Sequence, residues 1–287
     1  MKWDDVAVFL AVAETGSLSG AAQRLGVDHS TVYRRLKQLT SSLGVPLFHR
    51  DGGRYRPSEA GAAALPYARA AQEAMAALQR SVTGHDQALA GPVRLTAPES
   101  LLPLLAPLVA TFRRAHPAIE LHLDLTDRFL ALGELQADVA VRPTLRPPEG
   151  LHGRRVSAIA WAVYTPAGAS PGASPWAAYG HDLAHLAAAR WWEHHHRGTP
   201  RHLSVNSVPA MAQVVAQAGY RGLLPCFLGD ADPRVERHGP PVDEAASALW
   251  LLVHPDLRRA ARVRALLDHL WEGLKAHAPL LEGSGLL

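Results

Sequence analysis

Two short helical patterns joined by one tight turn occupy residues 16–44 of this 287-residue chain. Ser17 is placed to cap the first helix, Gly26 to end it, and Asp28 to cap the second. Apolar residues recur along the second helix at spacings of four, three and four, which predicts one stripe facing a core: Val32, Leu36, Leu39 and Leu43. The pattern predicts a helix-turn-helix, although an ordinary amphipathic helix with a solvated polar face has the same spacing.

The flanking segments supply the rest of a small domain. Upstream, a helix opening at Asp4 or Asp5 carries a further apolar stripe, which completes the three helices that a helix-turn-helix core needs. Downstream, residues 45–55 combine the apolar pair Leu47 and Phe48 with the turn signal Asp-Gly-Gly. This second pattern predicts a β-hairpin wing with basic residues at its tip.

Positive charge is concentrated in the same region. Between Asp28 and Arg56 six cations stand against two anions, and the resulting net charge of +4 exceeds the formal +3 of the whole chain. Such an excess favours a polyanion, because phosphate neutralisation and counterion release supply affinity. The residues expected nearest to the bases in a major groove are His29, Ser30, Thr31, Tyr33 and Arg34. Those expected at phosphates or in the adjacent minor groove are Lys37, Arg50, Arg54 and Arg56.

Fourteen positions of this region follow one family pattern: Phe9, Glu14, Gly16, Ser17, Ala21, Ala22, Leu25, Leu43, Gly44, Leu47, Phe48, Arg50, Ser58 and Gly61. With them, residues 2–61 resemble the winged helix-turn-helix of LysR-type transcriptional regulators. Tyr33 departs from the pattern, which usually has Ser there, and Thr40 replaces the usual Glu. The first departure puts the base preference in doubt, and the second removes a charge from the edge of the reading helix.

Composition indicates a globular protein of more than one domain. Hydrophobic residues make up 48% of the chain and charged residues 19%, and no apolar run approaches the roughly 18 residues of a membrane span. The N-terminus has no signal-peptide pattern, so we expect a cytoplasmic protein without a membrane partner. A single cysteine, Cys226, excludes an intrachain disulfide framework, and its apolar neighbours predict a buried thiol.

A connector follows the predicted wing. Ser58 is placed to cap a helix that continues to about Val82, and Pro66 predicts a kink or a break in it. One side carries apolar residues at near-heptad spacing: Leu65, Ala68, Met75, Leu78 and Val82. The family resemblance implies an antiparallel pairing of this helix between two subunits, and the alternative is packing onto its own chain. Polar and flexible residues at 83–86, followed by Gly91 and Pro92, predict a hinge.

From Val93 onward the pattern changes to alternating strands and helices, which predicts an α/β fold with parallel pairing. The predicted strands are residues 93–97, 119–125, 138–141, 159–164, 203–205, 223–225 and 249–253. The predicted helices are residues 101–115, 129–136, 208–218 and 258–275, with a surface loop at 166–175.

The family resemblance implies that this C-terminal part is a two-lobed effector domain similar to periplasmic binding proteins. The domains expected are a DNA-binding domain at 1–61, a linker helix and hinge at 58–91, and an effector domain at 92–287. Within the effector domain we expect lobe I at 92–161 and 254–287, and lobe II at 162–253. The chain crossings near Ala160 and His254 would then act as hinges.

Two strand-to-helix junctions, one in each lobe, are the expected effector site, because open α/β sheets bind ligands beyond the carboxyl ends of their strands. The candidate contacts are Thr96, Pro98, Glu99, Ser100, Leu101, Arg142, Asn206 and Ser207. Free N–H groups at the helix starts suit a small anion, with Arg142 as counter-charge. Glu99 weakens that idea, so the ligand class stays open. The alternative is that Ser100 and Ser207 are simple helix caps.

Two other classes of function have weaker support in the residues. His181 and His185 have the spacing of a helical metal-binding pair, and residues 194–196 are three consecutive histidines, but consecutive side chains diverge. An enzyme fused to a DNA-binding head lacks support, because no nucleophile elbow, phosphate loop or dinucleotide fingerprint is present. The sequence therefore predicts a non-enzymatic regulator that binds double-stranded DNA as a dimer or dimer of dimers. We expect a small-molecule effector, no cofactor, and RNA polymerase as a further candidate partner.

Overall fold

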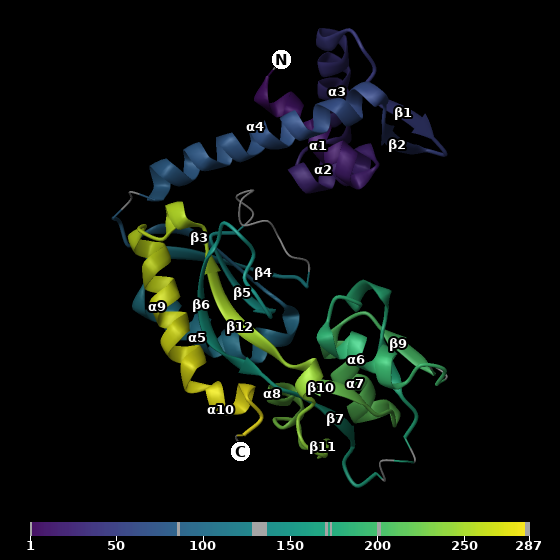
Figure 1. The fold of residues 1–287 in the computed structure, drawn as a ribbon. Helices are drawn as coiled ribbons and strands as arrows, with labels where there is room; N and C mark the ends of the chain where they lie inside the picture. Colours follow the sequence, from purple (N-terminus) through teal and green to yellow (C-terminus); the bar gives the residue numbers. More distant parts are fainter. Residues whose placement is uncertain are drawn as a thin grey trace. The chain divides into compact units, whose positions relative to one another are not determined.

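The computed structural model describes residues 2–84, 87–127, 137–169, 172, 174–199 and 202–284 (Figure 1). The chain divides into two compact units, Met1–Gln79 and Arg80–Leu287. The helix expected at residues 129–136 lies outside the described residues, as do His85 and Asp86 of the expected hinge.

Three helices and a hairpin form the first unit: α1 (Trp3–Thr15), α2 (Leu18–Leu25), α3 (His29–Leu43), β1 (Phe48–Asp51) and β2 (Arg54–Pro57). The Ser17 hydroxyl caps α2 by accepting a hydrogen bond from the Gly20 N–H at 3.0 Å. Gly26 ends α2 with a φ of +63°. Val32 and Leu36 of α3 pack against α1 and α2 in one core. The predicted helix-turn-helix is confirmed.

Two details of α3 differ from the prediction. Asp28 stands at the N-cap position, but its side chain makes no capping hydrogen bond within the described residues. Leu43 does not join the buried stripe, because α3 ends at this residue and Gly44 turns the chain away in the left-handed conformation. As a result, 46% of Leu43 is exposed, whereas Leu39 is buried.

The predicted wing is an antiparallel hairpin in which Asp51 pairs with Arg54 across a two-residue turn. Gly52 and Gly53 both have positive φ, at +56° and +83°, which is what a type I′ turn requires. The Tyr55 N–H donates to the Gly16 carbonyl at 2.8 Å and so ties the wing to the junction between α1 and α2. Phe48 packs against Phe9 of α1, with ring centroids 5.4 Å apart.

The connector is one continuous helix, α4 (Glu59–Gly84), which passes through Pro66 without a break. The Ser58 hydroxyl caps it, accepting from the Gly61 N–H at 3.0 Å. A Cβ at Gly61 would lie 2.0 Å from the Leu47 carbonyl oxygen, so only glycine allows this close approach. Leu65 and Ala68 pack into the core of the first unit, whereas 58% of Leu78 is exposed. The predicted stripe is therefore buried on its own chain at one end and exposed towards the other.

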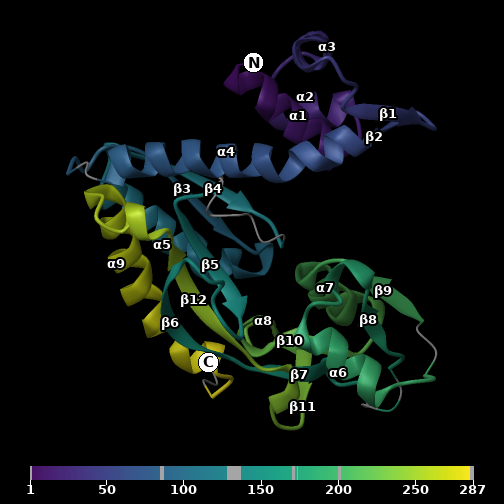
Figure 2. The same cartoon turned by 45° about the horizontal axis from the view of Figure 1, so that its top comes forward.

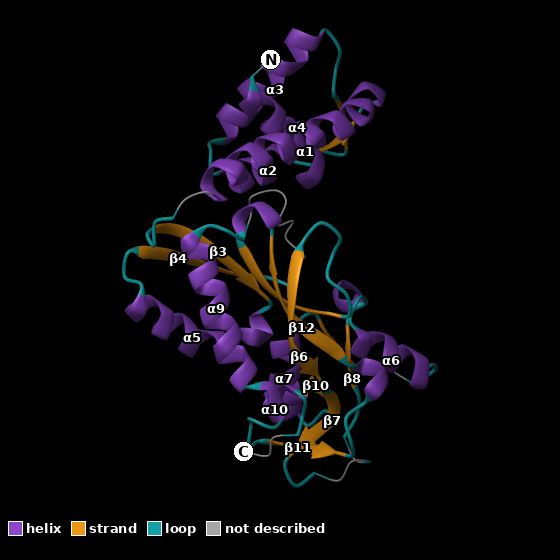
Figure 3. Cartoon of the chain, turned by 60° about the vertical axis from the view of Figure 1, so that its left-hand side comes forward, coloured by secondary structure: helices purple, strands orange, loops and turns teal. Residues whose placement is uncertain are grey.

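A five-stranded sheet in the order β4-β3-β5-β12-β6 organises the second unit (Figure 1). Its strands are β3 (Gly91–Ala97), β4 (Ile119–Leu125), β5 (Val139–Thr144), β6 (His152–Ile159) and β12 (Ser247–Val253). β3 is parallel to β4 and β5, whereas β12 is antiparallel to β5 and β6. The helices α5 (Leu102–Ala115) and α9 (Ala261–Ala276) pack together beside the sheet (Figure 3), where Phe112 contacts His269.

A second group of strands lies beyond the five-stranded sheet (Figure 2). β7 (Trp161–Pro166) pairs with β10 (Gly222–Pro225) and β11 (Val235–His238), and β8 (Ala177–Tyr179) is parallel to β9 (Leu203–Val205). The longer helices here are α6 (Ala187–His195) and α7 (Val208–Ala218). Short helical segments are η1 (Glu99–Leu101), η3 (His181–Leu183), η4 (Asp243–Ala245), η5 (Pro255–Leu257), α8 (Cys226–Gly229) and α10 (Ala278–Leu281). The α/β fold is confirmed, and Cys226 is buried as predicted.

The two crossings between the sheets correct the sequence-based boundaries. The single strand expected at 159–164 is two strands, because β6 ends and β7 begins on either side of Ala160, in different sheets. The return is expected near His254, but β12 already pairs with β5 and β6, so the chain returns between His238 and Ser247. The alternating apolar residues of β12, Leu249, Leu251 and Val253, are buried in the same core as the apolar side of α9. Their burial stabilises this strand in the first sheet. Pro255 opens η5, and α9 starts at Ala261, three residues after the predicted start.

Candidate DNA-reading face and effector cleft

The first candidate site is the exposed side of α3. His29, Ser30, Tyr33, Arg34 and Lys37 are all exposed, and Thr31 is half-buried. The exposed fraction of Tyr33 is 53%, which is large for an aromatic side chain. The predicted residues therefore share one polar face, opposite the buried Val32 and Leu36.

The neighbouring arginines of α3 have different roles. Arg35 is drawn towards α1, where its Nη1 lies 2.6 Å from Asp4 Oδ2. In the part of the chain that the structure describes, Arg34 and Lys37 form no ion pair with protein groups. On the exposed side of α3, the charges of Arg34 and Lys37 are therefore not offset by an ion pair among the described residues.

The wing adds a second group of cations. Arg50 and Arg54 are exposed on β1 and β2, and Arg50 lies 5.8 Å from the centroid of the Tyr55 ring. Arg56 faces Asp51 at 3.6 Å, but both side chains are about seven-tenths exposed, at 72% and 69%. An ion pair this exposed contributes little, so Arg56 can exchange Asp51 for a phosphate.

The second candidate site is a cleft of about 260 Å³ between the two sheets of the second unit. Its walls are mainly apolar: Pro98, Pro143, Leu145, Ile159, Trp161, Leu186, Val208, Pro225 and Phe227. The polar groups that line it are Ser100, Asp127, Arg142, Thr144, His185, Arg190 and Ser247. Apolar walls with a few convergent polar groups are typical of a small-molecule site.

Arg142 is the central charge of the cleft, and it is only 2% exposed. Its guanidinium donates to Thr96 Oγ1 at 2.7 Å and also to the Thr126 carbonyl. Burial lowers the pKa of Arg142, and the nearby Asp127 opposes that effect. Conversely, burial raises the pKa of Asp127, with Arg142 acting in the opposite direction. The charge of Arg142 is therefore partly compensated by Asp127, and its hydrogen bonds connect Thr96 with Thr126.

The cleft brings together only part of the predicted set. Pro98, Ser100 and Arg142 line it, and Thr96 lies beneath Arg142 as its hydrogen-bond acceptor. The other four predicted residues do not line the cleft. Glu99 and Asn206 are exposed to solvent outside it, and Leu101 belongs to the buried core. At the start of α7, Val208 lines the cleft instead of Ser207.

The two serines expected as caps behave differently. The Ser207 hydroxyl caps α7, accepting from the Ala210 N–H at 3.1 Å. Ser100 makes no such bond within the described residues, because η1 begins at Glu99 and places Ser100 inside its turn. The alternative interpretation, in which Ser100 is a simple helix cap, is therefore wrong, and Ser100 is a buried residue of the cleft wall.

Several cleft residues escape prediction from sequence. Trp161 and Ser247 each follow one of the crossings, and within the described residues neither Trp161 Nε1 nor Ser247 Oγ has a hydrogen-bond partner. Asp127 follows the carboxyl end of β4, so the strand-end rule could have found it. Helix α6, which contains Arg190 and begins shortly after His185, is not predicted from the sequence.

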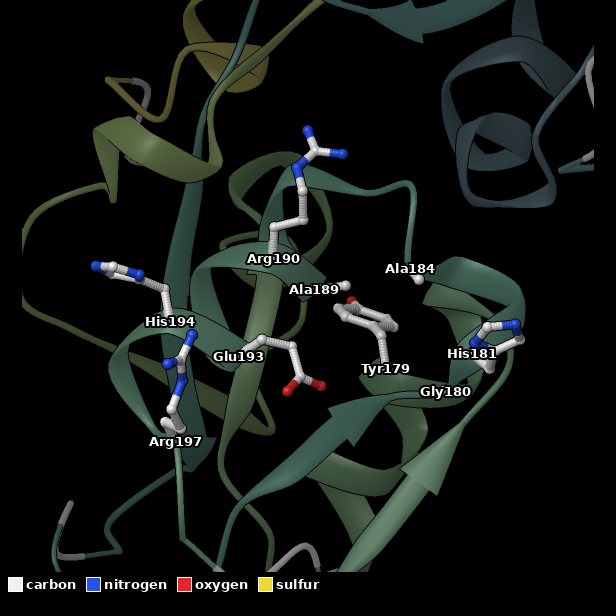
Figure 4. A pocket seen from close by; sticks show the side chains of 9 residues that line it. All are labelled: Tyr179, Gly180, His181, Ala184, Ala189, Arg190, Glu193, His194 and Arg197. Carbon is white, nitrogen blue, oxygen red and sulfur yellow. The ribbon is translucent and has the colours of Figure 1, made fainter.

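A larger hollow of about 490 Å³ lies beside the cleft, and Arg190 lines both (Figure 4). Arg190 and Glu193 project from α6, Arg197 follows the end of that helix, and His181 stands across from them (Figure 4). Tyr179 forms the floor, where its hydroxyl donates to the Leu223 carbonyl at 2.8 Å and burial raises its pKa. Charges of both signs therefore line the hollow, and an i, i+3 pair such as Arg190 and Glu193 is also typical of an ordinary solvated helix.

The histidines disperse over this region. His185 lines the cleft, whereas His194 and His181 line the hollow. His196 packs against Trp176, with ring centroids 4.5 Å apart, and burial lowers its pKa. Across the described residues, no group of three or more His, Cys, Asp or Glu side chains could hold a metal ion. Within the same residues, no helix is long and apolar enough to cross a membrane.

Both parts of the chain match models of one family. Residues 3–62 match the bacterial regulatory helix-turn-helix protein of the lysR family, and residues 86–275 match the LysR substrate binding domain. The chain therefore belongs to the LysR-type transcriptional regulators, DNA-binding proteins with an effector-binding domain.

Relatives and solved structures agree over nearly the full length. The Mau operon transcriptional activator of Paracoccus denitrificans is 30% identical over 263 residues, covering 90% of this chain and 91% of the relative. The probable HTH-type transcriptional regulator LtrA of Klebsiella pneumoniae is 27% identical, covering 95% and 94%. The full-length Vibrio cholerae virulence activator AphB has the same fold, with a TM-score of 0.59 at 18% identity, covering 94% and 98%.

Proposed function

We propose that this protein controls transcription by inserting α3 into the major groove of its operator, with the wing on the adjacent backbone. The observation that carries the proposal is the polar face of α3, on which Arg34 and Lys37 are exposed while Arg35 is drawn away to Asp4. His29, Ser30, Thr31, Tyr33 and Arg34 read base edges, whereas Lys37, Arg50, Arg54 and Arg56 contact phosphates or the minor groove. A protein with this task works in the cytoplasm, where the chromosome lies.

Protection of DNA tests this proposal. The probe is the intergenic DNA between this gene and a divergent neighbour, because regulators of this kind often control an adjacent gene. The wild-type protein should protect a discrete site from nuclease digestion, and Arg34→Ala should lose that protection while Arg24→Ala, whose side chain pairs with Glu14 at 2.8 Å, retains it. Uniform weak coverage by both variants and the wild type would contradict sequence-specific reading.

The same protein acts as a dimer, or a dimer of dimers, through α4. Met75, Leu78 and Val82 expose 38%, 58% and 69% of their surfaces on one side of this helix. Exposed apolar residues at near-heptad spacing are stabilised by a partner helix. Leu78→Glu should convert the dimer to monomers in analytical ultracentrifugation. Arg69→Glu introduces the same side chain at an exposed position on the opposite side of α4, so it should leave the dimer intact. A monomeric wild-type protein at micromolar concentration would overturn this part.

The effector is a small molecule that binds in the cleft between the two sheets, and its binding shifts the population of lobe arrangements without a chemical step. The apolar walls favour a ligand with an apolar body, and Trp161 Nε1 supplies a donor that lacks a partner among the described residues. A buried donor without an acceptor costs free energy, so a ligand oxygen placed there would gain affinity.

Ligand recovered unchanged after incubation supports a sensor, whereas its consumption would indicate an enzyme. Closure of the lobes would alter the spacing of the reading heads on DNA and the access of RNA polymerase.

A further inference from the structure

A third concave surface lies on the five-stranded sheet, away from the effector cleft. It has a volume of about 350 Å³ and lies between the edge strand β6, its neighbour β12 and the first half of α9. Leu251, Val253 and Leu267 give it an apolar floor, of which the first two are only 2% and 1% exposed. This volume is at the small end of the roughly 300 to 1,000 Å³ of typical ligand sites.

The rim of this pocket is strongly positive. Arg154, Arg258 and Arg264 line it together with His152, and Asp268 is the carboxylate among its lining residues. Arg154 is held in place by the Trp271 ring, whose centroid lies 3.4 Å from its guanidinium carbon. Its ion pair with Asp268 is long, at 3.9 Å, and both side chains are more than half exposed, at 51% and 67%. Asp268 therefore offsets little of the positive charge.

Arg258 and Arg264 carry the remaining charge. Both are exposed, and among the described residues neither side chain has an ion-pair or hydrogen-bond partner. Like charges that share one concavity repel each other, and an anion placed between them removes that repulsion. A forked guanidinium also fits a carboxylate or phosphate with two parallel hydrogen bonds.

We propose that this pocket binds a small amphipathic anion, with its apolar body on Leu251, Val253 and Leu267 and its charged group between Arg258 and Arg264. The site is separate from the effector cleft, with which it shares no lining residue. Leu251 and Val253 of its floor belong to β12, whose first residue, Ser247, lines the cleft. One strand thus contributes to both sites.

Titration of the full-length protein with hexanoate, followed by calorimetry, tests the site. Hexanoate should bind, while hexanol, which lacks the charge, and acetate, which lacks the apolar body, should bind much more weakly. Replacing both arginines, in Arg258→Ala with Arg264→Ala, should weaken hexanoate binding at least about tenfold. The neighbouring Arg259→Ala is the matched control, because Arg259 is also exposed but does not line the pocket.

A second variant, which is expected to strengthen binding, distinguishes a loss of the site from a loss of folding. Asp268→Asn removes the opposing carboxylate with little change of shape, so hexanoate should bind a few-fold more tightly. Several results would overturn the proposal: no hexanoate binding, hexanol binding as tight as hexanoate, no effect of the double variant, or an equal loss in Arg259→Ala. Weaker binding in Asp268→Asn would overturn it as well, because the pocket would then not select an anion by its charge.

Discussion

The two candidate sites of this regulator are built in opposite ways. On α3, residues spaced three and four apart form a buried side and the residues between them an exposed side, so one helix supplies most of the candidate DNA-reading groups. In the effector cleft, the groups come from strands, crossings and helices between Pro98 and Ser247. The arginines show the difference most clearly: Arg34 is exposed, whereas Arg142 is buried and engaged with Thr96 and Thr126. The charge of Arg34 is thus exposed to solvent, whereas the charge of Arg142 is used within the fold.

Loss of Arg142 should destabilise the protein more than loss of an exposed arginine. Arg142→Met keeps the apolar stem but leaves the Thr96 hydroxyl and the Thr126 carbonyl without their donor. Unsatisfied buried groups, with Asp127 left uncompensated, should cost the second unit about 3 kcal/mol of unfolding free energy. Arg146→Met, on an exposed residue close by, should cost little. Urea denaturation followed by tryptophan fluorescence measures both, and equal stability of the two variants would refute the structural role of Arg142.

Arg34 should behave in the reverse manner. Arg34→Ala should leave stability unchanged, because the side chain is exposed, but should weaken operator binding by about 2 kcal/mol if it reads a base. Fluorescence anisotropy on the operator and on unrelated DNA separates the two kinds of contact. An equal loss on both would assign Arg34 to the phosphate backbone. Arg35→Ala is the matched control and should lose far less, because its charge already pairs with Asp4.

The same contrast explains what sequence could reveal. Periodicity predicts the face of α3, and the Gly-Gly turn predicts the wing, because each depends on neighbours in the chain. Such local rules also find α7 and β4 with their correct bounds. They miss the return of β12 to the first sheet, which depends on partners about one hundred residues away. Two features are equally invisible, because only tertiary packing determines them: the engagement of Arg142, and the Trp161 Nε1 donor, which has no hydrogen-bond partner among the described residues.

Two matched helix caps allow a direct comparison of the units. Ser17 and Ser207 each accept a hydrogen bond from the N–H three residues ahead, at 3.0 and 3.1 Å. Ser17→Ala and Ser207→Ala should each destabilise their own unit by about 1 kcal/mol. The conservative variants Ser17→Thr and Ser207→Thr should restore most of it. Because two units need not unfold together, hydrogen exchange at α2 and α7 is the better measurement. A Ser207→Ala variant that loses effector binding but no protection would instead make this serine a ligand contact.

A weak pH dependence of stability is expected from His196, whose ring packs against Trp176, Trp191 and Trp192 in the second unit. Burial lowers its pKa below the ordinary 6.5, and Arg221 and His195 act in the same direction. The neutral ring is thus favoured on folding, so its contribution is fully present above pH 6.5 and is lost as the pH falls from there through the lowered pKa. His196→Phe keeps an aromatic ring against Trp176 and removes the titration. The difference in unfolding free energy between variant and wild type, measured from about pH 7.5 downwards, should shift in favour of the variant below about pH 6.5. A difference that stays constant over that range would show that His196 is free to titrate as it does in the unfolded chain.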